Sequence, residues 1–275
     1  MDDLLQKRIK QRDRWTCRLC GSKFVRLQLV KYEDPPEDDS YITVCDECFH
    51  QRILHMSTEE AQKLCRSAQK RTKVVLIGDA HGRFDRLDEI LTAEAPFDFF
   101  ISVGDVGSLL DAGSVYNINI VDKWGNKGYF VKGNHDDAEF FSRLELMQEI
   151  GGLRVAGLNG IIRHNTFIRD TKNISFREVL YLTHQKDVDI LVTHQAPTGV
   201  FTGKGEPVLE EVLNYLVPKI YIFGHVHSYK LKFHLNTFVM SLPLVTKGHA
   251  VAYFQGRDLR NLEVIFRKGK KVIRV

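Results

Sequence analysis

Side chains able to bind metal or to transfer protons recur along the chain, each just after a short apolar segment. The segment "VVLIG" is followed by Asp79 and His81, which are two positions apart. The other positions of this kind are Asp105, Asn134, His135, Asp136, His194, His225 and His227. An isolated pair such as Asp79 and His81 is typical of a helix cap and a loop histidine. Because the pattern returns after five separate segments, we expect a single site built from five strand ends.

Buried strands must position these side chains, since each apolar segment is short and ends at or near a glycine. The first expected strand begins at residue 74. The other four cover residues 98–104, 128–133, 189–194 and 219–224. Helical spacing of apolar residues predicts helices between them, over residues 83–94, 137–150 and 206–216. Strands that alternate with helices indicate an α/β fold.

Four further strands are expected near the end of the chain, where they would complete a second sheet. They cover residues 237–242, 250–255, 261–266 and 270–275. The segment "FRKGKKV" between the last two is typical of a hairpin turn.

Taken in order, the five motifs resemble the signature of the calcineurin-like metallophosphoesterases. That signature consists of D-x-H, G-D, G-N-H-D or G-N-H-E, a lone histidine, and G-H-x-H. The resemblance covers residues 73–255 and depends on the order and spacing of all five motifs, since one alone is uninformative. It implies a four-layer α/β/β/α sandwich and an enzyme that hydrolyses phosphate esters.

A mixed set of carboxylate, amide and imidazole donors suits Mn, Fe or Zn better than a hard cation such as Mg. Seven donors are too many for one ordinary site but suit two divalent metals that share a carboxylate. The resemblance divides the donors into Asp79, His81 and His227 for one metal, Asn134, His194 and His225 for the other, and Asp105 as the bridge.

The remaining two residues of the "GNHD" motif have a catalytic interpretation by the same resemblance. It implies that His135 faces the phosphate and either protonates the leaving oxygen or stabilises its charge, and that Asp136 orients the His135 ring. The alternatives are that His135 is a loop residue and that Asp136 caps the helix expected after it; for Asp136 both roles are compatible.

The substrate is less constrained than the reaction. Protein phosphatases of the superfamily typically carry G-D-x-x-D-R-G, from which "GDVGSLLDAG" departs. Residues 151–161 and 189–199 are more similar to members that cleave phosphodiesters, including lariat-debranching enzymes, although those commonly have cysteine where this chain has Asp79. Further candidate phosphate contacts are Arg83, Arg163, His164 and Lys204.

The first part of the chain carries two C-x-x-C pairs, Cys17 with Cys20 and Cys45 with Cys48, separated by 24 residues. Four thiolates at this spacing are typical of one closed, structural zinc site. The alternative is a set of reduced, buried cysteines. The fifth cysteine, Cys65, lies in a segment where Ser57 and Glu60 match a helix capping box, so we interpret it as a packed helix residue.

Nine Lys or Arg residues and one acid lie between residues 7 and 31, whereas the whole chain carries a net charge of only +4. Such a basic zinc module suits a nucleic-acid or protein partner. The chain offers no apolar segment of signal-peptide or membrane-spanning length, which predicts a cytoplasmic protein with no membrane contact.

We therefore predict a zinc-ribbon-like module over residues 1–56, a linker helix over 57–72 and a phosphoesterase domain over 73–275. The favoured substrate is a phosphodiester, in a nucleic acid or nucleotide. One alternative is a protein or small-molecule phosphomonoesterase whose zinc module is a docking surface. Another is a non-catalytic binding protein on a phosphoesterase scaffold.

Overall fold

The computed structural model describes ten stretches of the chain and divides it into two compact units. The described residues are 3–13, 15, 17–19, 25–31, 40–107, 115–136, 140–162, 173–201, 205–267 and 269–274. Unit 1 comprises Met1–Thr72 and Phe254–Arg260, and unit 2 comprises Lys73–Tyr253 and Asn261–Val275.

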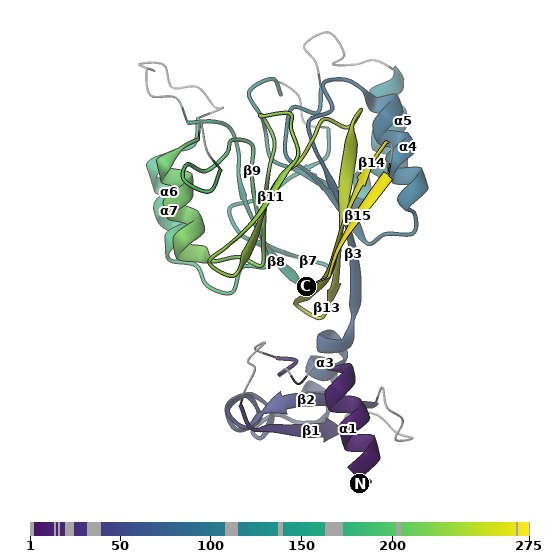
Figure 1. Ribbon diagram of the computed structural model, residues 1–275, viewed down its shortest axis with the longest axis vertical. Helices are drawn as coiled ribbons and strands as arrows, with labels where there is room; N and C mark the ends of the chain where they lie inside the picture. The colour runs from purple at the N-terminus through teal and green to yellow at the C-terminus, as the bar shows by residue number, and fades with distance from the viewer. Residues whose placement is uncertain are drawn as a thin grey trace. The chain divides into compact units, whose positions relative to one another are not determined.

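Unit 1 contains a two-stranded antiparallel sheet with short helices around it (Figure 1). Its elements are α1 (Asp3–Arg12), β1 (Leu27–Lys31), β2 (Tyr41–Cys45), α2 (Asp46–Cys48), η2 (Phe49–Ile53) and α3 (Thr58–Gln69). The expected capping box is present at α3, because the Ser57 hydroxyl accepts from the Glu60 N–H and the Glu60 carboxylate accepts from the Ser57 N–H. A small core of cysteines and aliphatic residues, including Ile42 and Val44, lies beneath these elements.

One buried guanidinium connects three parts of unit 1. Arg18 donates to the carbonyl oxygen of Ala68 at 2.8 Å, to that of Gln255 at 2.7 Å, and to the carboxylate of Asp258. A guanidinium has five donors in a fixed fork, so it can bind several acceptors at once. Arg18 therefore fixes the segment next to Cys17 against the end of α3 and against residues 254–260, which belong to the same unit.

Unit 2 is built on two sheets. The seven-stranded sheet has the order β15-β14-β13-β3-β4-β5-β6, and the six-stranded sheet has the order β11-β12-β10-β9-β8-β7. The strands of the first are β3 (Arg71–Ile77), β4 (Phe99–Ser102), β5 (Gly128–Phe130), β6 (Ser142–Arg143), β13 (Gly248–Gln255), β14 (Asp258–Phe266) and β15 (Gly269–Arg274). The strands of the second are β7 (Gln148–Ile150), β8 (Leu153–Leu158), β9 (Ile190–Thr193), β10 (Ile220–Phe223), β11 (Lys230–His234) and β12 (Thr237–Ser241).

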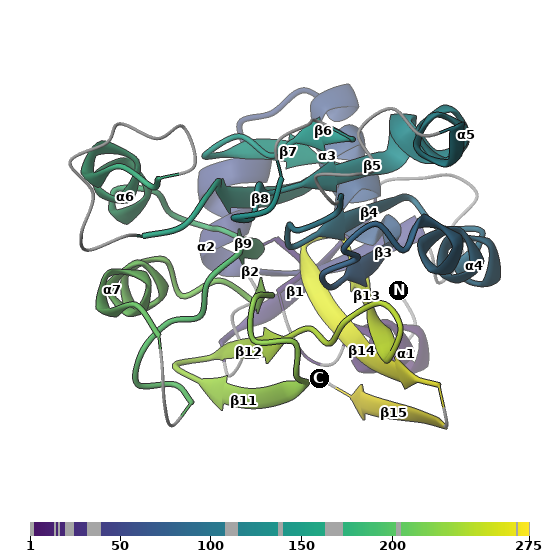
Figure 2. The same cartoon turned by 90° about the horizontal axis from the view of Figure 1, so that it is seen from above.

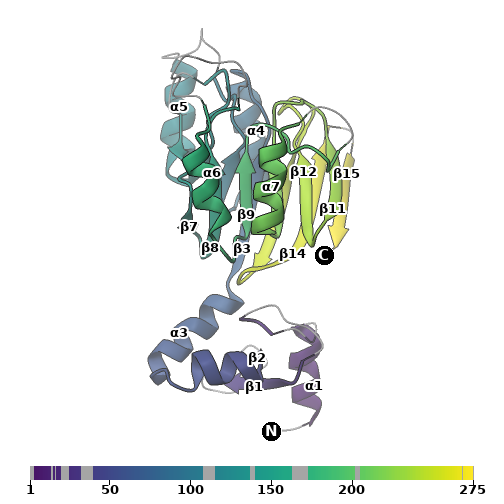
Figure 3. The same cartoon turned by 90° about the vertical axis from the view of Figure 1, so that its left-hand side faces the viewer.

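Helices cover the outer face of each sheet, which gives four layers (Figures 1 and 2). The helices α4 (Phe84–Glu94) and α5 (Val115–Trp124), the latter followed by η3 (Gly125–Lys127), pack on the seven-stranded sheet. The helices α6 (Phe176–Thr183) and α7 (Pro207–Leu216) pack on the six-stranded sheet, as Figure 3 shows. Strand residues that alternate with the helix-facing ones, such as Val74, Leu76 and Ile222, are also fully buried, so they fill the space between the sheets. The predicted α/β/β/α sandwich is confirmed.

The helix predicted over residues 137–150 is wrong. Residues 137–139 lie outside the described part, and residues 140–150 contain β6 and β7 instead. Phe140 packs against Phe84, and Phe141 packs edge-on against Phe100, so the apolar residues that suggested a helical face enter the core from a loop. After these two residues, β6 pairs with β5 in one sheet, and β7 pairs with β8 in the other.

The prediction that the four late strands complete the second sheet is also wrong in part. Only β12 joins the six-stranded sheet, beside β10, whereas β13, β14 and β15 form a meander next to β3. Pro243 follows β12 and has no N–H with which to continue the ladder. A turn in which the N–H groups of Lys247 and Gly248 both bond to the Leu244 carbonyl then carries the chain to the other sheet.

Candidate active site

The carboxyl ends of five parallel strands from both sheets supply the candidate site. The strands β3, β4 and β5 run parallel in one sheet, and β9 and β10 run parallel in the other. Asp79, Asp105 and Asn134 follow the first three strands, and His194, His225 and His227 follow the last two. Since equivalent ends of parallel strands lie at one edge, each sheet presents its own half of the donor set there.

Two groups of three donors form across the sheets. One contains Asp79, His81 and His227, the other contains Asp105, His194 and His225, and in each group the donor atoms lie within 4.8 Å of one another. The grouping combines a carboxylate from the seven-stranded sheet with a histidine from the six-stranded sheet in both cases. The structure thus brings six of the seven predicted ligands together as two clusters.

The first cluster has the spacing of ligands around one ion. His227 Nε2 lies 2.9 Å from Asp79 Oδ2 and 3.0 Å from His81 Nε2. Two nitrogens that are each about 2.1 Å from a shared metal lie about 3 Å apart, so these separations fit a metal site. The remaining oxygen, Asp79 Oδ1, is buried and has no hydrogen-bond partner among the described residues.

The second cluster is organised around the fully buried His194. Its Nδ1 lies 2.8 Å from the Val103 carbonyl oxygen, which can only accept, so Nδ1 carries a proton. The other nitrogen, Nε2, lies 3.3 Å from Asp105 Oδ2 and 3.1 Å from Asn134 Oδ1. The seventh predicted ligand, Asn134, therefore belongs to this cluster, and the carbonyl fixes the tautomer that leaves Nε2 available as a ligand.

The electrostatics of the two carboxylates call for additional positive charge. Burial, together with the charge of the nearby Asp105, raises the pKa of Asp79 to about 7. Burial also acts to raise the pKa of Asp105, but His194 and the His135 N–H group outweigh it and lower that pKa to about 2. Two buried carboxylates in one site repel each other unless cations offset their charge. The unpartnered Asp79 oxygen, the two buried carboxylates and the imidazoles beside them are together a donor set that fits divalent metals.

Backbone strain is concentrated at the donor residues. Four of them have positive φ angles: His81 at 46°, Asp105 at 49°, His225 at 63° and His227 at 52°. Such conformations are unfavourable for residues with a Cβ atom and cluster at functional sites. Glycines allow close packing beside them, because a Cβ on Gly224 would lie 2.0 Å from Asp79 Oδ1 and one on Gly133 would lie 2.1 Å from Asp105 Oδ1.

The two predicted catalytic residues of the "GNHD" motif differ in their surroundings. His135 is exposed, its ring centre is 5.6 Å from that of His81, and its backbone N–H donates to Asp105 Oδ1 at 2.8 Å. Asp136 is buried and accepts from the backbone N–H groups of Asp105 at 2.7 Å, Val106 at 2.8 Å, Gly107 at 3.3 Å and Gly133 at 2.9 Å.

These four bonds change the interpretation of Asp136. In the described part of the chain both of its oxygens bond to backbone amides and neither bonds to the His135 imidazole. The expected direct orientation of the His135 ring is therefore replaced by a contact that clamps the loop after β4 to the loop after β5. Sequence reasoning missed this role because backbone donors leave no trace in residue types.

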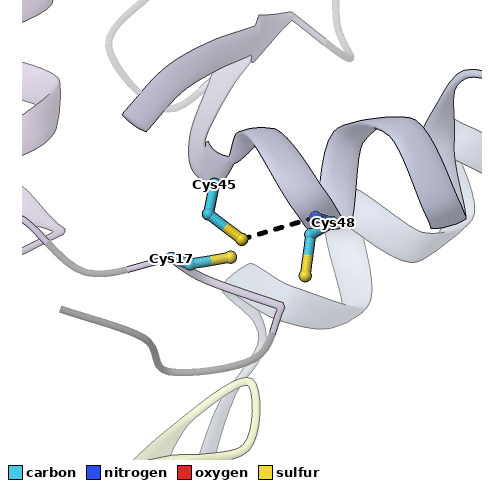
Figure 4. A group of neighbouring side chains, drawn as sticks. All are labelled: Cys17, Cys45 and Cys48. Carbon is cyan, nitrogen blue, oxygen red and sulfur yellow. Dashed lines mark hydrogen bonds between the residues drawn. The ribbon is translucent and has the colours of Figure 1, made fainter. Parts of the chain in front are cut away.

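Three of the four predicted zinc ligands lie together in unit 1 (Figure 4). Cys17, Cys45 and Cys48 are all buried and direct their sulfur atoms toward one space, and the Cys48 N–H donates to Cys45 Sγ at 3.4 Å. The fourth predicted ligand, Cys20, lies outside the described residues. Cys65 is fully buried within α3 and is not in this cluster, as expected for a packed helix residue.

The predicted additional phosphate contacts gain little support. Arg163, His164 and Lys204 fall outside the described residues. Arg83 is exposed and forms a bidentate ion pair with Asp85 at 3.0 and 2.7 Å. Its guanidinium is thus engaged with a neighbouring side chain.

The two sheets, their helices and the paired Asp and His clusters define an α/β phosphoesterase sandwich. Residues 72–229 match the family described as Calcineurin-like phosphoesterase, and the chain belongs to that family. The match begins one residue before the region expected from the motifs and ends two residues after His227.

Individual relatives are distant. The lariat debranching enzyme of Schizosaccharomyces pombe is 23% identical over 223 residues, with 57% of this chain and 48% of that protein covered. The chain therefore spans about half the length of this curated relative. TT1561 of Thermus thermophilus is 13% identical with a TM-score of 0.52, covering 70% of this chain and 98% of that one. Wild-type Vps29 of Entamoeba histolytica complexed with Zn²⁺ is 14% identical with a TM-score of 0.44, covering 74% and 98%.

Proposed function

We propose that this protein is a two-metal phosphoesterase that hydrolyses phosphate diesters in a nucleic acid or nucleotide. The observation that carries the proposal is the pair of clusters, Asp79 with His81 and His227, and Asp105 with His194 and His225, side by side at the strand ends. The diester preference is supported by the similarity to a lariat debranching enzyme.

The ligand assignment follows the two clusters. Asp79, His81 and His227 would hold one metal, Asn134, His194 and His225 the other, and Asp105 would contribute to both because it lies between His81 and His194, 3.9 and 3.3 Å from their Nε2 atoms. Two bound metals would lower the pKa of a shared water and offset the charge of the phosphoryl oxygens. Mn, Fe and Zn all suit this mixture of donors.

Residues outside the set of metal ligands would transfer a proton to the leaving oxygen and hold the loops of the site in position. His135 is exposed beside His81 and can donate a proton to the leaving oxygen of the ester. Its backbone is held by Asp105 Oδ1, so its ring is directed from a fixed anchor. Asp136 supports it indirectly, by bonding to the N–H groups on both loops that carry Asp105 and His135.

A structural zinc in unit 1 is a second part of the proposal. Cys20 would complete the set formed by Cys17, Cys45 and Cys48, within a module that covers residues 1–56 and precedes a linker at 57–72. The basic residues of this module suit a polyanionic partner such as the substrate nucleic acid. For the described residues, no helix is long and apolar enough to cross a membrane.

Rates on two model substrates test the reaction. Protein loaded with Mn²⁺ is expected to release 4-nitrophenolate from bis(4-nitrophenyl) phosphate faster than from 4-nitrophenyl phosphate. Hydrolysis of the monoester alone would exclude the diester preference and favour the phosphomonoesterase alternative. Two catalytic metals per chain by elemental analysis, beyond the zinc, are expected in the same sample.

Asp105→Asn separates an enzyme from a scaffold. The substitution keeps the shape of the side chain but removes the charge between the two clusters, so the rate should fall roughly a thousandfold. Unchanged circular dichroism would show that the fold is intact. If the native protein and the variant hydrolysed the diester at the same background rate, the view that the fold is a non-catalytic scaffold would be favoured.

A further inference from the structure

A small pocket lies next to the candidate active site and is not used by the proposed chemistry. Its volume is about 110 Å³, and its lining includes Ala196, Pro197, Phe201, Phe223, Val226 and Lys230. A cavity of about 150 Å³ lined by apolar side chains holds one benzene molecule. This pocket is somewhat smaller but open, so it suits a single ring of which one part stays outside.

Chain connectivity places the pocket close to both donor clusters. Val226 stands between His225 and His227, and these two histidines belong to different clusters. Ala196 and Pro197 follow His194 after one intervening residue. A group that contacts Val226 and Ala196 is therefore within a residue or two of ligands from both clusters, as expected for a base that the sugar joins to a phosphate at those clusters.

The lining combines apolar side chains with the polar groups of Lys230 and Ser241. Phe201, Phe223 and Val226 offer carbon surfaces, and the exposed Lys230 places its ammonium 6.0 Å from the centre of the Phe201 ring. Among the residues that the structure describes, Lys230 has no carboxylate partner. A planar ring with acceptor oxygens can pack on the aromatic face and receive a hydrogen bond from the ammonium.

We propose that this pocket binds the base of a nucleotide ester, with a pyrimidine-sized ring against Phe201 and Val226 and its carbonyl oxygen toward Lys230. This inference rests on the proposed phosphodiesterase function and names its substrate class. It makes Phe201 and Lys230 specificity residues rather than catalytic ones, since neither belongs to the metal-binding clusters.

Two phosphate ligands that differ only in the base test the pocket. Thymidine 5′-monophosphate and 2-deoxyribose 5-phosphate are compared as inhibitors of bis(4-nitrophenyl) phosphate hydrolysis. The base should improve the inhibition constant about tenfold, because stacking on an aromatic side chain contributes about that much. Equal inhibition constants would overturn the subsite while leaving the phosphodiesterase proposal intact.

Paired variants locate the effect. Phe201→Ala should reduce the tenfold ratio to about one, and Lys230→Met should reduce it several-fold, with little change for the sugar phosphate. Phe176→Ala and Lys232→Gln are the matched controls, because Phe176 is 75% exposed on α6 and Lys232 lies further along β11. A ratio that survives both Phe201→Ala and Lys230→Met would show that the base binds elsewhere.

The test also stands if hydrolysis fails. Lys230 is on the surface, so the Lys230→Met variant is expected to fold even if the Phe201→Ala variant does not. If the metal-loaded protein cleaves neither model substrate, the proposed function fails, and the two phosphate ligands are then compared by calorimetric titration. Tighter binding of thymidine 5′-monophosphate that depends on Lys230 would still support the pocket, and equal dissociation constants would exclude it.

Discussion

The two candidate metal sites of this protein differ in donors and in access. The cysteine cluster of unit 1 offers sulfur, and its three described cysteines are buried. The active-site clusters of unit 2 offer oxygen and nitrogen, and their rim is open, since His225 and His135 are exposed and His227 is partly so. A closed set of thiolates is typical of a structural ion, whereas catalysis needs positions that a substrate can reach.

The two sites also differ in how the chain builds them. The cysteine pair at residues 45 and 48 lies in one turn of backbone with ordinary angles. The candidate active site draws on strands from two sheets and places four candidate donors in left-handed conformations. Metal binding would thus contribute folding free energy in unit 1, whereas in unit 2 the fold itself holds strained donors in place.

The largest effect is expected from loss of the cysteine site. Zinc binding in small modules contributes about 10 to 16 kcal/mol of apparent free energy, so Cys45→Ser should remove the ion and unfold unit 1. Elemental analysis should report loss of zinc, and limited proteolysis should cut within residues 1–72. Activity on the small diester should stay within about threefold, because no active-site donor lies in that unit. Retained zinc and protease resistance would contradict a structural role.

The next effect tests how tightly unit 2 positions its donors. A methyl group at Gly224 would meet Asp79 Oδ1, which must then move, so Gly224→Ala should lower kcat/KM about a hundredfold. Gly125→Ala is the control, since its added methyl group would meet only the Val121 side chain, at 3.3 Å. Equal kinetics for the two variants would mean that Asp79 tolerates displacement and is no ligand.

A smaller effect is expected when the clamp at Asp136 is changed. An Asn at this position turns one acceptor oxygen into an NH₂ group, which in either orientation faces two backbone N–H donors. Asp136→Asn should therefore lower the free energy of unfolding by about 2 kcal/mol, measured by urea denaturation.

Asp98→Asn provides the reference for this clamp. The Asp98 carboxylate accepts a hydrogen bond from the Lys73 N–H, and an amide oxygen can replace it, so the cost should stay below about 0.5 kcal/mol. A similar cost for the two variants would show that the Asp136 carboxylate does not hold the loops together.

The sequence predicts that the candidate donors come together, because their chemistry is carried by residue type and order. Asp79, Asp105 and His194 follow apolar strands whose ends must meet, so a linear pattern becomes a cluster in space. The assignment of strands to sheets is less predictable. The turn after Pro243 moves the chain from one sheet to the other, and apolar alternation is the same for a strand in either sheet.

Other features depend on contacts that residue types do not reveal. The loop with Phe140 and Phe141 has helical apolar spacing, but tertiary packing and strand pairing at two sheet edges determine its conformation. The roles of Asp136 and Arg18 depend on backbone acceptors and donors that every residue carries. The pocket at Phe201 combines a loop, a strand end and a hairpin, which no local motif indicates.

The smallest effect is expected at Cys65, the cysteine that is buried but is not in the candidate metal cluster. Cys65 is as buried as Cys17, and burial raises the pKa of its thiol to about 11, so it stays protonated where a zinc ligand must be a thiolate. Cys65→Ala should keep one zinc per chain and cost only about 1 kcal/mol of stability from lost packing. In the native protein Cys65 should also resist alkylation at pH 8. Loss of zinc in this variant would instead place Cys65 among the ligands and remove the distinction between the two kinds of buried cysteine.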